Sequence, residues 1–495
     1  MTAWLGAIDL GALRARLGLP TAGRRPGAAA GPDLAPRPIG LAAVIDGHGA
    51  LGRACDAIAG LRSGSGEVVV LAAATPMTIR GDLLRDVIEE LAGRRFAVRW
   101  AVLGPADGAV HADQQTVALA SAAAAGASCA VTVGSGTITD IGKAAAPAGT
   151  PLVAVQTATS VNGYADPFSV LLRDGVKRTT PTRWPDVLVI DHDVLAGAPA
   201  ELNRAGVGDM AAMFTASADW YLAAAVSAGG PPYLAEVADL VRPHGERMFG
   251  LGDGVAEHAA ELARLLTLSG ITMGVAGSTA PASGMEHAIS HLLEMAAGAP
   301  GAGRGGPGGP GTRGVPGRPS LPGNAHGELV GVASVIAAAT WEHLLRRIAA
   351  GALGRPARLP EPGLAAERIA AAFSSLDPSG NMAAECLADY TAKLRLLAGR
   401  PDPLAALRAR WPAHGAALGD LLAGPGTIAA GLRRAGLPAT FAELPVPVDD
   451  RTARWAVANC ALQRRRFGAA DLAMLLGAWT DDDVDAVLAA AGVLS

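Results

Sequence analysis

Side chains that are far apart in the sequence have the types expected of a divalent-metal site. His287 lies in the segment G-M-E-H-A-I-S-H, four residues before His291, so a helix would place both imidazoles on one face. His326 follows a long Gly/Pro-rich stretch in N-A-H-G-E, and Asp209 lies upstream in G-V-G-D-M, at the head of an Ala-rich helical pattern. Two imidazoles and one carboxylate on separate helices can hold a divalent cation and leave coordination positions open.

Each of these residues, taken alone, also has an ordinary structural explanation. A single histidine is usually part of a core, and Asp209 after Gly208 has the position of a helix N-cap. Glu286 is either an orienting partner of the His287 imidazole or a solvated carboxylate. The metal hypothesis depends on the set, because the remaining histidines have no such company and are interpreted as structural: His48, His111, His192, His244, His258, His343 and His414.

Two turns that follow predicted strands have the composition of nucleotide-binding loops. In the turn from Gly134 to Lys143, Gly134 and Gly136 let the backbone approach a diphosphate, and the start of the following helix favours an anion. The turn from Thr157 to Asn162 carries hydroxyls that could bind a ribose or a nicotinamide amide at the same edge of a sheet. A tight strand–helix turn and a hydroxyl-rich helix cap are the alternative explanations.

Only three lysines occur, Lys143, Lys177 and Lys393, against many arginines. Two of them, Lys143 and Lys177, lie near the candidate site. A lysine ammonium is a compact point charge, unlike the planar guanidinium of arginine, so a lysine kept there suggests a function. The pair Lys177-Arg178 could contact an anionic substrate, although a solvated loop pair is the more common explanation.

The order of the predicted elements indicates two domains. From Ile39 to about Leu195, β-branched runs such as Glu67–Ala73 alternate with helical patterns such as Ile79–Leu91, which is typical of a parallel sheet. From Pro199 onwards only helical periodicity remains. We therefore expect a flexible leader at 1–37, an α/β dinucleotide-binding domain at 38–198, and a helical metal and substrate domain at 199–495 with a disordered Gly/Pro-rich insertion at 297–323.

Composition excludes several classes of protein. A net charge of -4 over 495 residues gives no electrostatic basis for binding nucleic acid or an anionic membrane. The four cysteines are widely separated, which argues against a disulfide scaffold or a zinc ribbon and fits a reducing compartment. No signal peptide or membrane span is apparent, so we expect a cytoplasmic protein without membrane insertion. The assembly state is left open, a homo-oligomer included.

Five segments, in order, resemble the motifs of the sn-glycerol-1-phosphate dehydrogenases. They are G-S-G-T-I-T-D-I-G-K, T-A-T-S-V-N-G-Y-A-D, A-G-V-G-D-M, S-G-M-E-H-A-I-S-H-L-L-E-M and H-G-E-L-V-G-V. That family belongs to a superfamily with glycerol dehydrogenase, iron-dependent alcohol dehydrogenases and 3-dehydroquinate synthase. The resemblance implies a dehydroquinate synthase-like fold, α/β plus all-α, with an N-terminal Rossmann-like parallel-sheet domain, a C-terminal helical domain and the site in the cleft between them.

The resemblance also implies roles for individual residues. Asp209, His287 and His326 match the metal ligands, with zinc the usual ion and nickel or iron as alternatives. Asp209, His291 and Asn162 match catalytic or substrate-contacting positions. Positions that match NAD or NADP contacts are Gly134, Gly136, Thr137, Ile138, Thr139, Asp140, Lys143, Thr157, Ala158, Thr159, Ser160 and Asp166.

Two departures from the family pattern bear on the substrate and the cofactor. Asn162 stands where the family usually has an aspartate, so a charge and a proton acceptor are missing. The turn after Leu71 reads A-A-A-T-P and has no carboxylate for an adenosine ribose, which weakens any preference for NAD over NADP.

The expected reaction is hydride transfer between NAD(P)H and dihydroxyacetone phosphate or a similar small phosphorylated ketone. Two alternatives remain. One is a lyase-type cyclisation of the 3-dehydroquinate synthase kind, in which the bound nucleotide is recycled. The other is a catalytically weak binding protein that has kept the fold.

Overall fold

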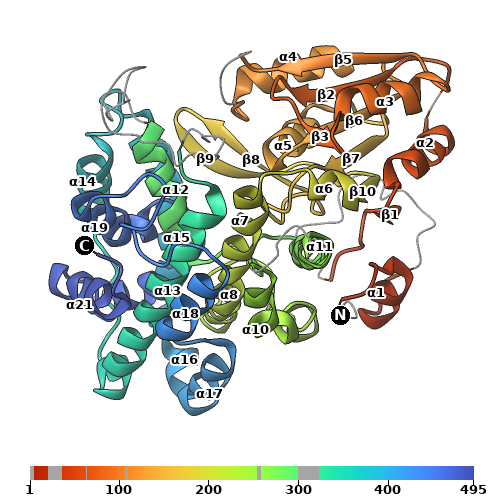
Figure 1. Ribbon diagram of the computed structural model, residues 1–495. Helices are drawn as coiled ribbons and strands as arrows, with labels where there is room; N and C mark the ends of the chain where they lie inside the picture. The colour runs from red at the N-terminus through yellow and green to blue at the C-terminus, as the bar shows by residue number, and fades with distance from the viewer. Residues whose placement is uncertain are drawn as a thin grey trace.

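The computed structural model describes residues 5–20, 36–62, 64–105, 110–252, 258–298 and 323–494. A parallel sheet with flanking helices occupies one side of the molecule, and a larger helical part occupies the other (Figure 1). Every strand of the described residues lies before His192, and the helices from Ala200 onwards form the second part. The expected α/β plus all-α fold is confirmed.

Six parallel strands form the sheet, in the order β1-β10-β7-β6-β2-β5. The strands are β1 (Ala43–Gly47), β2 (Val68–Ala73), β5 (Val98–Leu103), β6 (Cys129–Gly134), β7 (Leu152–Gln156) and β10 (Val187–Asp191). β7 and β10 are buried throughout, as expected of Val/Leu-rich strands covered on both faces. Because all six strands run the same way, the turns after β6 and β7 meet at one edge of the sheet.

Helices cover the two faces of this sheet. α2 (Ala50–Leu61) and α3 (Leu84–Gly93) pack on one face, and α4 (Gln114–Ala124) and α5 (Gly136–Ala145) pack on the other. Both faces of β10 are apolar and need such cover: Val187 and Val189 face the α2 side, and Leu188 and Ile190 face the opposite side.

One predicted helix begins later than expected. The segment expected as a helix from Ile79 to Leu91 starts with a small hairpin of β3 (Thr78–Ile79) and β4 (Asp82–Leu83). Its turn is Arg80-Gly81, and both residues have positive φ, which glycine adopts without steric cost. α3 therefore begins only at Leu84.

A longer hairpin leaves the sheet beside the candidate site. β8 (Phe168–Arg173) and β9 (Val176–Pro181) pair antiparallel, with Leu172 opposite Lys177. β8 contacts α5, and β9 contacts α12 (Met285–Gly298) of the helical part. The hairpin thus lies between the two halves of the molecule (Figure 1).

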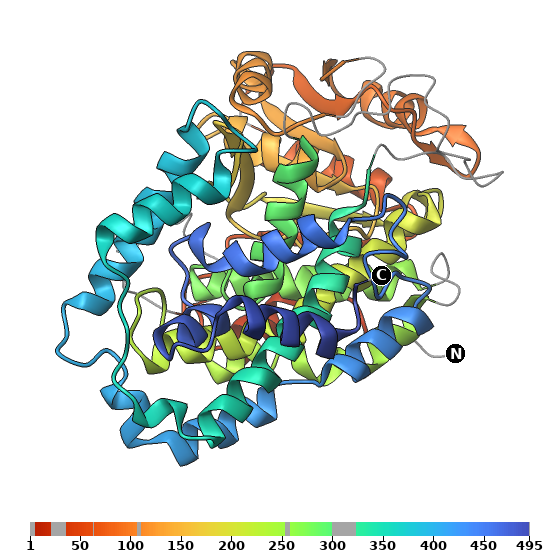
Figure 2. The same cartoon turned by 90° about the vertical axis from the view of Figure 1, so that its left-hand side faces the viewer.

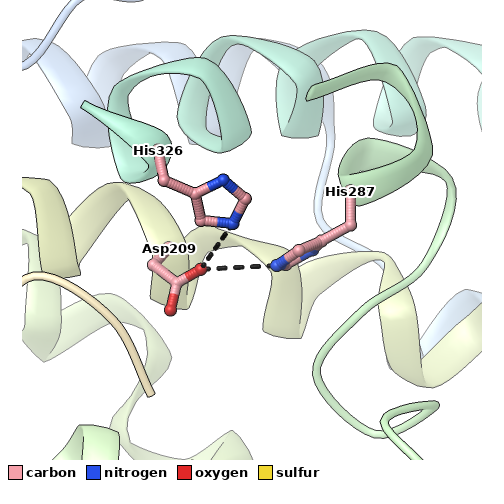
Figure 3. A group of neighbouring side chains, drawn as sticks. All are labelled: Asp209, His287 and His326. Carbon is pink, nitrogen blue, oxygen red and sulfur yellow. Dashed lines mark ion pairs between the residues drawn. The ribbon is translucent and has the colours of Figure 1, made fainter. Parts of the chain in front are cut away.

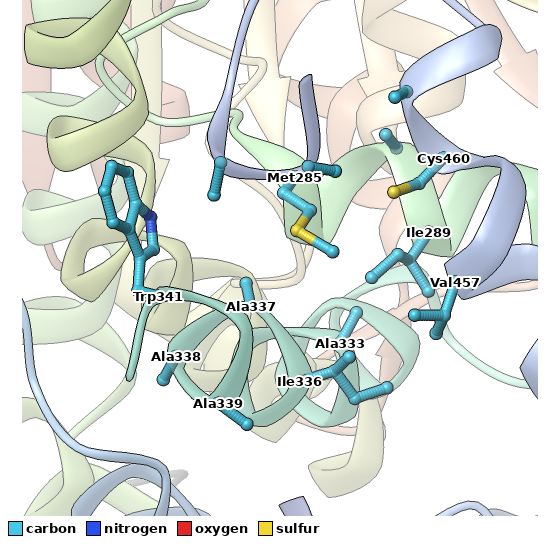
Figure 4. Close-up of a cluster of buried hydrophobic side chains, with 14 of the residues drawn as sticks. Met285, Ile289, Ala333, Ile336, Ala337, Ala338, Ala339, Trp341, Val457 and Cys460 are labelled. Atoms are coloured by element: carbon cyan, nitrogen blue, oxygen red, sulfur yellow. The ribbon is translucent and has the colours of Figure 1, made fainter. Parts of the chain in front are cut away.

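The helical part is organised around α13 (His326–Ala349). Ile336 and Ala337 of α13 are fully buried, and α13 packs against α7, α12, α18 and α21. Figure 4 shows this core, in which Met285 and Ile289 of α12 and Val457 of α19 approach the Ala-rich face of α13. Between β10 and this helical part lies the short helix α6 (His192–Ala196). The remaining helices of the part, seen from the side in Figure 2, are α7 (Ala200–Met210), α8 (Ala216–Ala225), α9 (Ala235–Ala238), α10 (Gly245–Met248), α11 (Ala259–Ala276), α14 (Pro362–Phe373), α15 (Asn381–Ala398), α16 (Ala405–Ala409), α17 (Trp411–Leu421), α18 (Pro425–Arg434), α19 (Asp450–Asn459), α20 (Ala469–Leu475) and α21 (Asp481–Ala491).

Two of the helices, α11 and α13, are long and apolar enough by composition to cross a membrane. In each, 89% of the apolar window is buried inside the protein, as expected of core helices.

The N-terminal leader is more ordered than expected. α1 (Leu10–Arg16) buries Leu10, and Leu17 and Leu19 after it pack into the same cluster as α11 and β10. The buried Arg14 donates to the Leu41 carbonyl at 2.6 Å. The expectation of a flexible tail is therefore wrong for residues 5–20, because the short amphipathic pattern there is long enough to bury one apolar face. Residues 21–35, and most of the expected insertion at 297–323, lie outside the described residues; Ala297 and Gly298 complete α12.

Candidate active site

A cavity of about 330 Å³ lies where the sheet edge meets the helical part. Its walls come from the turns after β6 and β7, the β8–β9 hairpin, α7, the loop before α12, α12 itself and the start of α13. Asp209, His287, His291 and His326 all line it, together with Asn162. The structure thus brings the expected metal and substrate residues into the same cavity as the first nucleotide-binding turn.

Asp209, His287 and His326 converge on one point, as Figure 3 shows. Oδ1 of Asp209 lies 3.3 Å from Nε2 of His287 and 3.8 Å from Nε2 of His326. Ligands held about 2.0–2.2 Å from a tetrahedral ion are separated by roughly 3.3–3.6 Å. One separation lies in this range and the other slightly above it, so the three residues form a candidate site for a divalent cation. The donor set of one carboxylate and two imidazoles fits zinc, iron or nickel equally well in kind.

A carboxylate stands behind each imidazole. Oε1 of Glu286 lies 3.0 Å from Nδ1 of His287, and Oε1 of Glu294 lies 3.1 Å from Nδ1 of His326. Each contact fixes the ring so that Nε2 faces Asp209, the arrangement common behind metal-bound histidines. Burial alone would lower the pKa of His287, but Asp209 and Glu286 outweigh it and raise that pKa.

Close helix packing explains the glycines of G-V-G-D and H-G-E. A Cβ on Gly208 of α7 would overlap the carbonyl of Gly327, and a Cβ on Gly327 of α13 would overlap the carbonyl of Ala205. The two backbones therefore touch where Asp209 and His326 begin to face each other. Glu328, three residues into this segment, accepts from Ala325 N at 2.9 Å and fixes the start of α13.

His291 lies beside the metal residues but is not part of their group. Its ring centroid is 5.6 Å from that of His326 and 6.2 Å from that of His287. Burial lowers the pKa of His291 well below its ordinary value, so the imidazole is neutral near neutral pH. A neutral ring can both donate and accept one hydrogen bond within the cavity.

Asn162 is tied to the metal residues through its backbone. Its N–H donates to Oδ2 of Asp209 at 3.0 Å, and its side-chain amide donates to Oγ of Ser269 at 3.1 Å. The first bond leaves Oδ1 of Asp209 free to face the histidines. The second leaves the side-chain oxygen of Asn162 as the group available to a ligand.

The first nucleotide-binding turn presents only part of the expected set to the cavity. Ser135, Gly136, Thr137 and Asp140 line the cavity at the start of α5. Gly136 has room for no side chain, because a Cβ there would overlap Val161. The other expected positions, Gly134, Ile138 and Thr139, are buried away from the cavity.

Lys143 does not line the cavity either. Its ammonium is buried and lies 3.0 Å from Oδ1 of Asp140 and 3.1 Å from Oδ1 of Asp166. It also donates to the carbonyls of Gly163 and Phe168. Burial and the neighbouring Asp140 raise the pKa of Asp166 to about 7, against the opposing effect of Lys143. The lysine thus fixes the loop after β7, while Asp140 and Asp166 reach the cavity wall.

The second turn, like the first, has some expected residues in the cavity wall and others buried behind it. Ser160 lines the cavity, whereas Thr159 is buried and bonds through N and Oγ1 to Asn203 of α7. Thr157 and Ala158 are buried behind Ser160. Thr159 therefore joins the sheet edge to the helix that carries Asp209.

Sequence analysis missed several residues of this site. His111, interpreted there as structural, lines the cavity from the loop before α4. Glu294 was not singled out, and no local pattern marks it except its position seven residues after His287 on the same helical face. Lys177 and Arg178 form no solvated pair: Lys177 contacts Glu294, and Arg178 donates to the Gln463 carbonyl at 2.9 Å.

Known proteins share this architecture. A family model described as iron-containing alcohol dehydrogenase matches residues 46–199. A probable glycerol dehydrogenase from Sinorhizobium meliloti 1021 superposes with a TM-score of 0.52 at 16% identity, covering 91% of this chain and 97% of that one. Glycerol dehydrogenase from Schizosaccharomyces pombe gives 0.52 at 14% identity, covering 92% and 89%. The protein therefore has the fold of the iron-containing alcohol dehydrogenases, a class that uses NAD(P) and a divalent metal.

Sequence relatives narrow the class further. The glycerol-1-phosphate dehydrogenase (NAD(P)+) of Hyperthermus butylicus is 31% identical over 323 residues, which span 59% of this chain and 85% of that protein. That of Halorubrum lacusprofundi is 29% identical over 351 residues, or 67% and 87%. That of Bacillus licheniformis is 35% identical over 196 residues, or 38% and 48%. The chain belongs to the glycerol-1-phosphate dehydrogenase family of the iron-containing alcohol dehydrogenases, which confirms the resemblance stated from the motifs.

Proposed function

We propose that the protein catalyses metal-dependent hydride transfer between NAD(P)H and dihydroxyacetone phosphate or a similar small phosphorylated ketone. One observation carries the proposal: the carboxylate-backed group of Asp209, His287 and His326 shares its cavity with the turn at the start of α5. The names of the sequence relatives support the substrate class.

The two ends of the cavity suit the two reactants. Ser135, Gly136 and Thr137 offer backbone N–H groups at a helix start, where the dipole favours the diphosphate of a dinucleotide. Asp209, His287 and His326 would hold the metal, which when bound supplies a Lewis acid that polarises the ketone oxygen. The contribution of the protein is to hold the nicotinamide and the ketone close together and aligned, because hydride transfer requires both.

The remaining side chains position substrate and protons. Asn162 offers its side-chain oxygen to a substrate hydroxyl, since its amide N–H already donates to Ser269. His291, neutral and beside the metal residues, donates a hydrogen bond to the substrate and passes the proton that the reduced oxygen requires.

A direct assay tests the reaction. Dihydroxyacetone phosphate should oxidise NADH or NADPH stoichiometrically, activity should disappear on chelation and return with a divalent metal, and chiral analysis should identify the glycerol phosphate formed. His287→Ala should lose both tight metal binding and turnover, whereas His414→Ala, which removes a remote imidazole beside Tyr221, should retain them. Retention of metal and activity by His287→Ala would refute the site assignment.

The same assay separates the alternatives. A cyclase of the 3-dehydroquinate synthase kind would recycle its bound nucleotide and show no net change in NADH absorbance. A binding protein without catalysis would show neither turnover nor metal-dependent activity.

A further inference from the structure

One lysine lines the metal side of the cavity. Among the described residues of the cavity wall, Lys177 is the only lysine or arginine. Its Nζ lies 2.8 Å from Oε2 of Glu294, and the other oxygen of Glu294 contacts Nδ1 of His326. The side chain of Lys177 is 30% exposed, so the ammonium is both accessible and two contacts away from a metal ligand.

The β8–β9 hairpin places this charge away from the nucleotide turn. β8 contacts α5, whose first residues form that turn, whereas β9 carries Lys177 and contacts α12. Lys177 therefore belongs to the wall that holds His287 and His291, and a group bound there would lie beside the metal residues.

Other cations near the cavity are already engaged. Lys143 is buried between Asp140 and Asp166. Arg464 donates to Oγ of Ser283 and to the Gly284 carbonyl, and Arg466 donates to the loop from Thr279 to Ser283. These guanidinium groups support the loop from behind, so they do not supply a charge to a ligand directly.

Lys177 keeps the capacity to bind an anion in spite of its contact with Glu294. An ammonium has three N–H donors, and Glu294 takes one of them. Glu294 also shares its negative charge with the imidazole of His326. With a divalent ion held at Asp209, the ion and Lys177 would present two cationic groups on one wall, which suits a compact dianion.

We propose that Lys177 binds the phosphate of the substrate and selects a short ketone whose phosphate lies close to its carbonyl. This rests on the proposed function, because it assumes that the carbonyl lies at Asp209, His287 and His326. Lys177 contacts Glu294, and Glu294 contacts His326, so the ammonium lies close to the candidate metal site. A ligand that reaches both the metal and the ammonium therefore has few atoms between its carbonyl and its phosphate. An uncharged ketone would gain nothing from this contact.

Comparison of two substrates tests the proposal. Dihydroxyacetone phosphate and uncharged dihydroxyacetone would be assayed with metal-loaded wild type, Lys177→Met, Lys177→Arg and Arg94→Met. Arg94 is 74% exposed and pairs with Glu90 on α3, so Arg94→Met controls for the loss of one positive charge. We expect Lys177→Met to lower the ratio of kcat/KM for the phosphorylated over the uncharged ketone by roughly 10- to 100-fold, mainly through KM, because one charged hydrogen bond is lost. Lys177→Arg should recover part of that ratio, and Arg94→Met should leave it unchanged.

Calorimetric titration with inorganic phosphate gives a readout independent of turnover. Metal-loaded wild type should bind phosphate roughly 10- to 100-fold more tightly than Lys177→Met at equal metal content. An equal loss with both ketones would show that Lys177 acts only through Glu294 on the metal ligand, and would overturn the proposal. If wild type reduces neither ketone, the proposed function fails, and the titration alone decides the phosphate site: equal affinity in both proteins, or no binding, overturns it.

Discussion

Oε1 of Glu286 lies 3.0 Å from Nδ1 of His287, and both side chains are buried. The other carboxylate oxygen accepts from the hydroxyl of Thr215, in the segment after α7, at 2.8 Å. Two adjacent residues thus join α12 to the segment that follows Asp209. The orientation of an imidazole in the candidate metal site is therefore set by a carboxylate that the linear sequence presents as a possible surface residue.

Replacing Glu286 by Gln should weaken metal binding without removing a ligand. The amide cannot hold the imidazole as firmly, so we expect the affinity for a divalent metal to fall by about 10- to 100-fold. Competition with a chromogenic chelator measures this constant. Glu367→Gln, a change on the exposed face of α14, is the matched control. Equal constants in both variants would show that Glu286 only fills space.

Glycine at position 208 sets the separation of the helices that carry Asp209 and His326. In Gly208→Ala the new Cβ would overlap the Gly327 carbonyl, so α7 and α13 must move apart. Overpacking of this kind costs about 1–3 kcal/mol, partly offset by the roughly 1 kcal/mol that Ala gains over Gly in a helix. We expect lower metal affinity together with unchanged or reduced stability, measured by chelator competition and denaturant unfolding.

Gly419→Ala provides the control of opposite sign. Gly419 lies inside α17, is exposed, and a Cβ there meets no atom within 4 Å. Alanine should therefore stabilise the protein by about 0.4–1 kcal/mol and leave metal affinity unchanged. If Gly208→Ala behaved like Gly419→Ala, the close approach of α7 and α13 would not matter to the site.

Lys143 should act as a structural rather than a cofactor-binding residue. Lys143→Met leaves the buried Asp166 beside the partly buried Asp140 without the counter-charge of the lysine, and breaking a buried pair in this way typically costs about 3–5 kcal/mol. Asp166→Asn in the same chain removes one of the two charges and should restore much of the loss, as a double-mutant cycle in denaturant would show. Additive losses would contradict the coupling, and unchanged stability with a raised KM for the nucleotide would return Lys143 to the cofactor.

Local patterns in the sequence predicted most of the strands. Val-rich runs such as Leu152–Gln156 need burial on both faces, which is typical of strands in a parallel sheet covered by helices. The hairpin around Arg80-Gly81 was missed because each of its strands has two residues, too few to show the alternation of a strand. The packing of Leu10 and Leu17, in the expected flexible leader, was missed for a related reason: whether a short amphipathic helix packs depends on the surface it meets, here α11 and β10.

Some features of the candidate site were likewise predictable from the sequence, and others depend on contacts between distant segments. The proximity of Asp209, His287 and His326 was predictable, because their residue types restrict the chemistry and their motifs resemble those of one family. The contacts of Lys143 and Thr159 were not predictable, because both residue types also occur in ligand-binding turns. Only the fold shows that Lys143 meets Asp166 and that Thr159 meets Asn203. Glu294 and Lys177 became part of the site only through contact between α12 and a hairpin more than a hundred residues earlier.

Asp219 should give the folded protein a measurable pH dependence. The side chain is buried and accepts from Met285 N and Ala469 N, which joins α8 to α12 and α20. Burial, followed by the charge of Glu286, raises the pKa of Asp219 to about 7 and outweighs the two amides. Between its unfolded value near 3.8 and about pH 7, the folded state therefore holds a proton that the unfolded state has released. Stability from this group is present at low pH and is lost as pH rises through that window.

Asp219→Asn removes this titration and so isolates its effect. In metal-free protein, the unfolding free energy of wild type minus that of Asp219→Asn should fall by up to about 1.4 kcal/mol per pH unit between pH 4 and pH 7. Asp377 is the control of opposite sign, because bonds from Met382 N and Ser379 hold its pKa below the ordinary value. For Asp377→Asn the same difference should instead fall on the acid side, as pH drops through the folded pKa. A flat difference for Asp219→Asn across the window would mean that its carboxylate stays ionised, with Arg464 and Arg466 near the same cluster supplying the compensating charge.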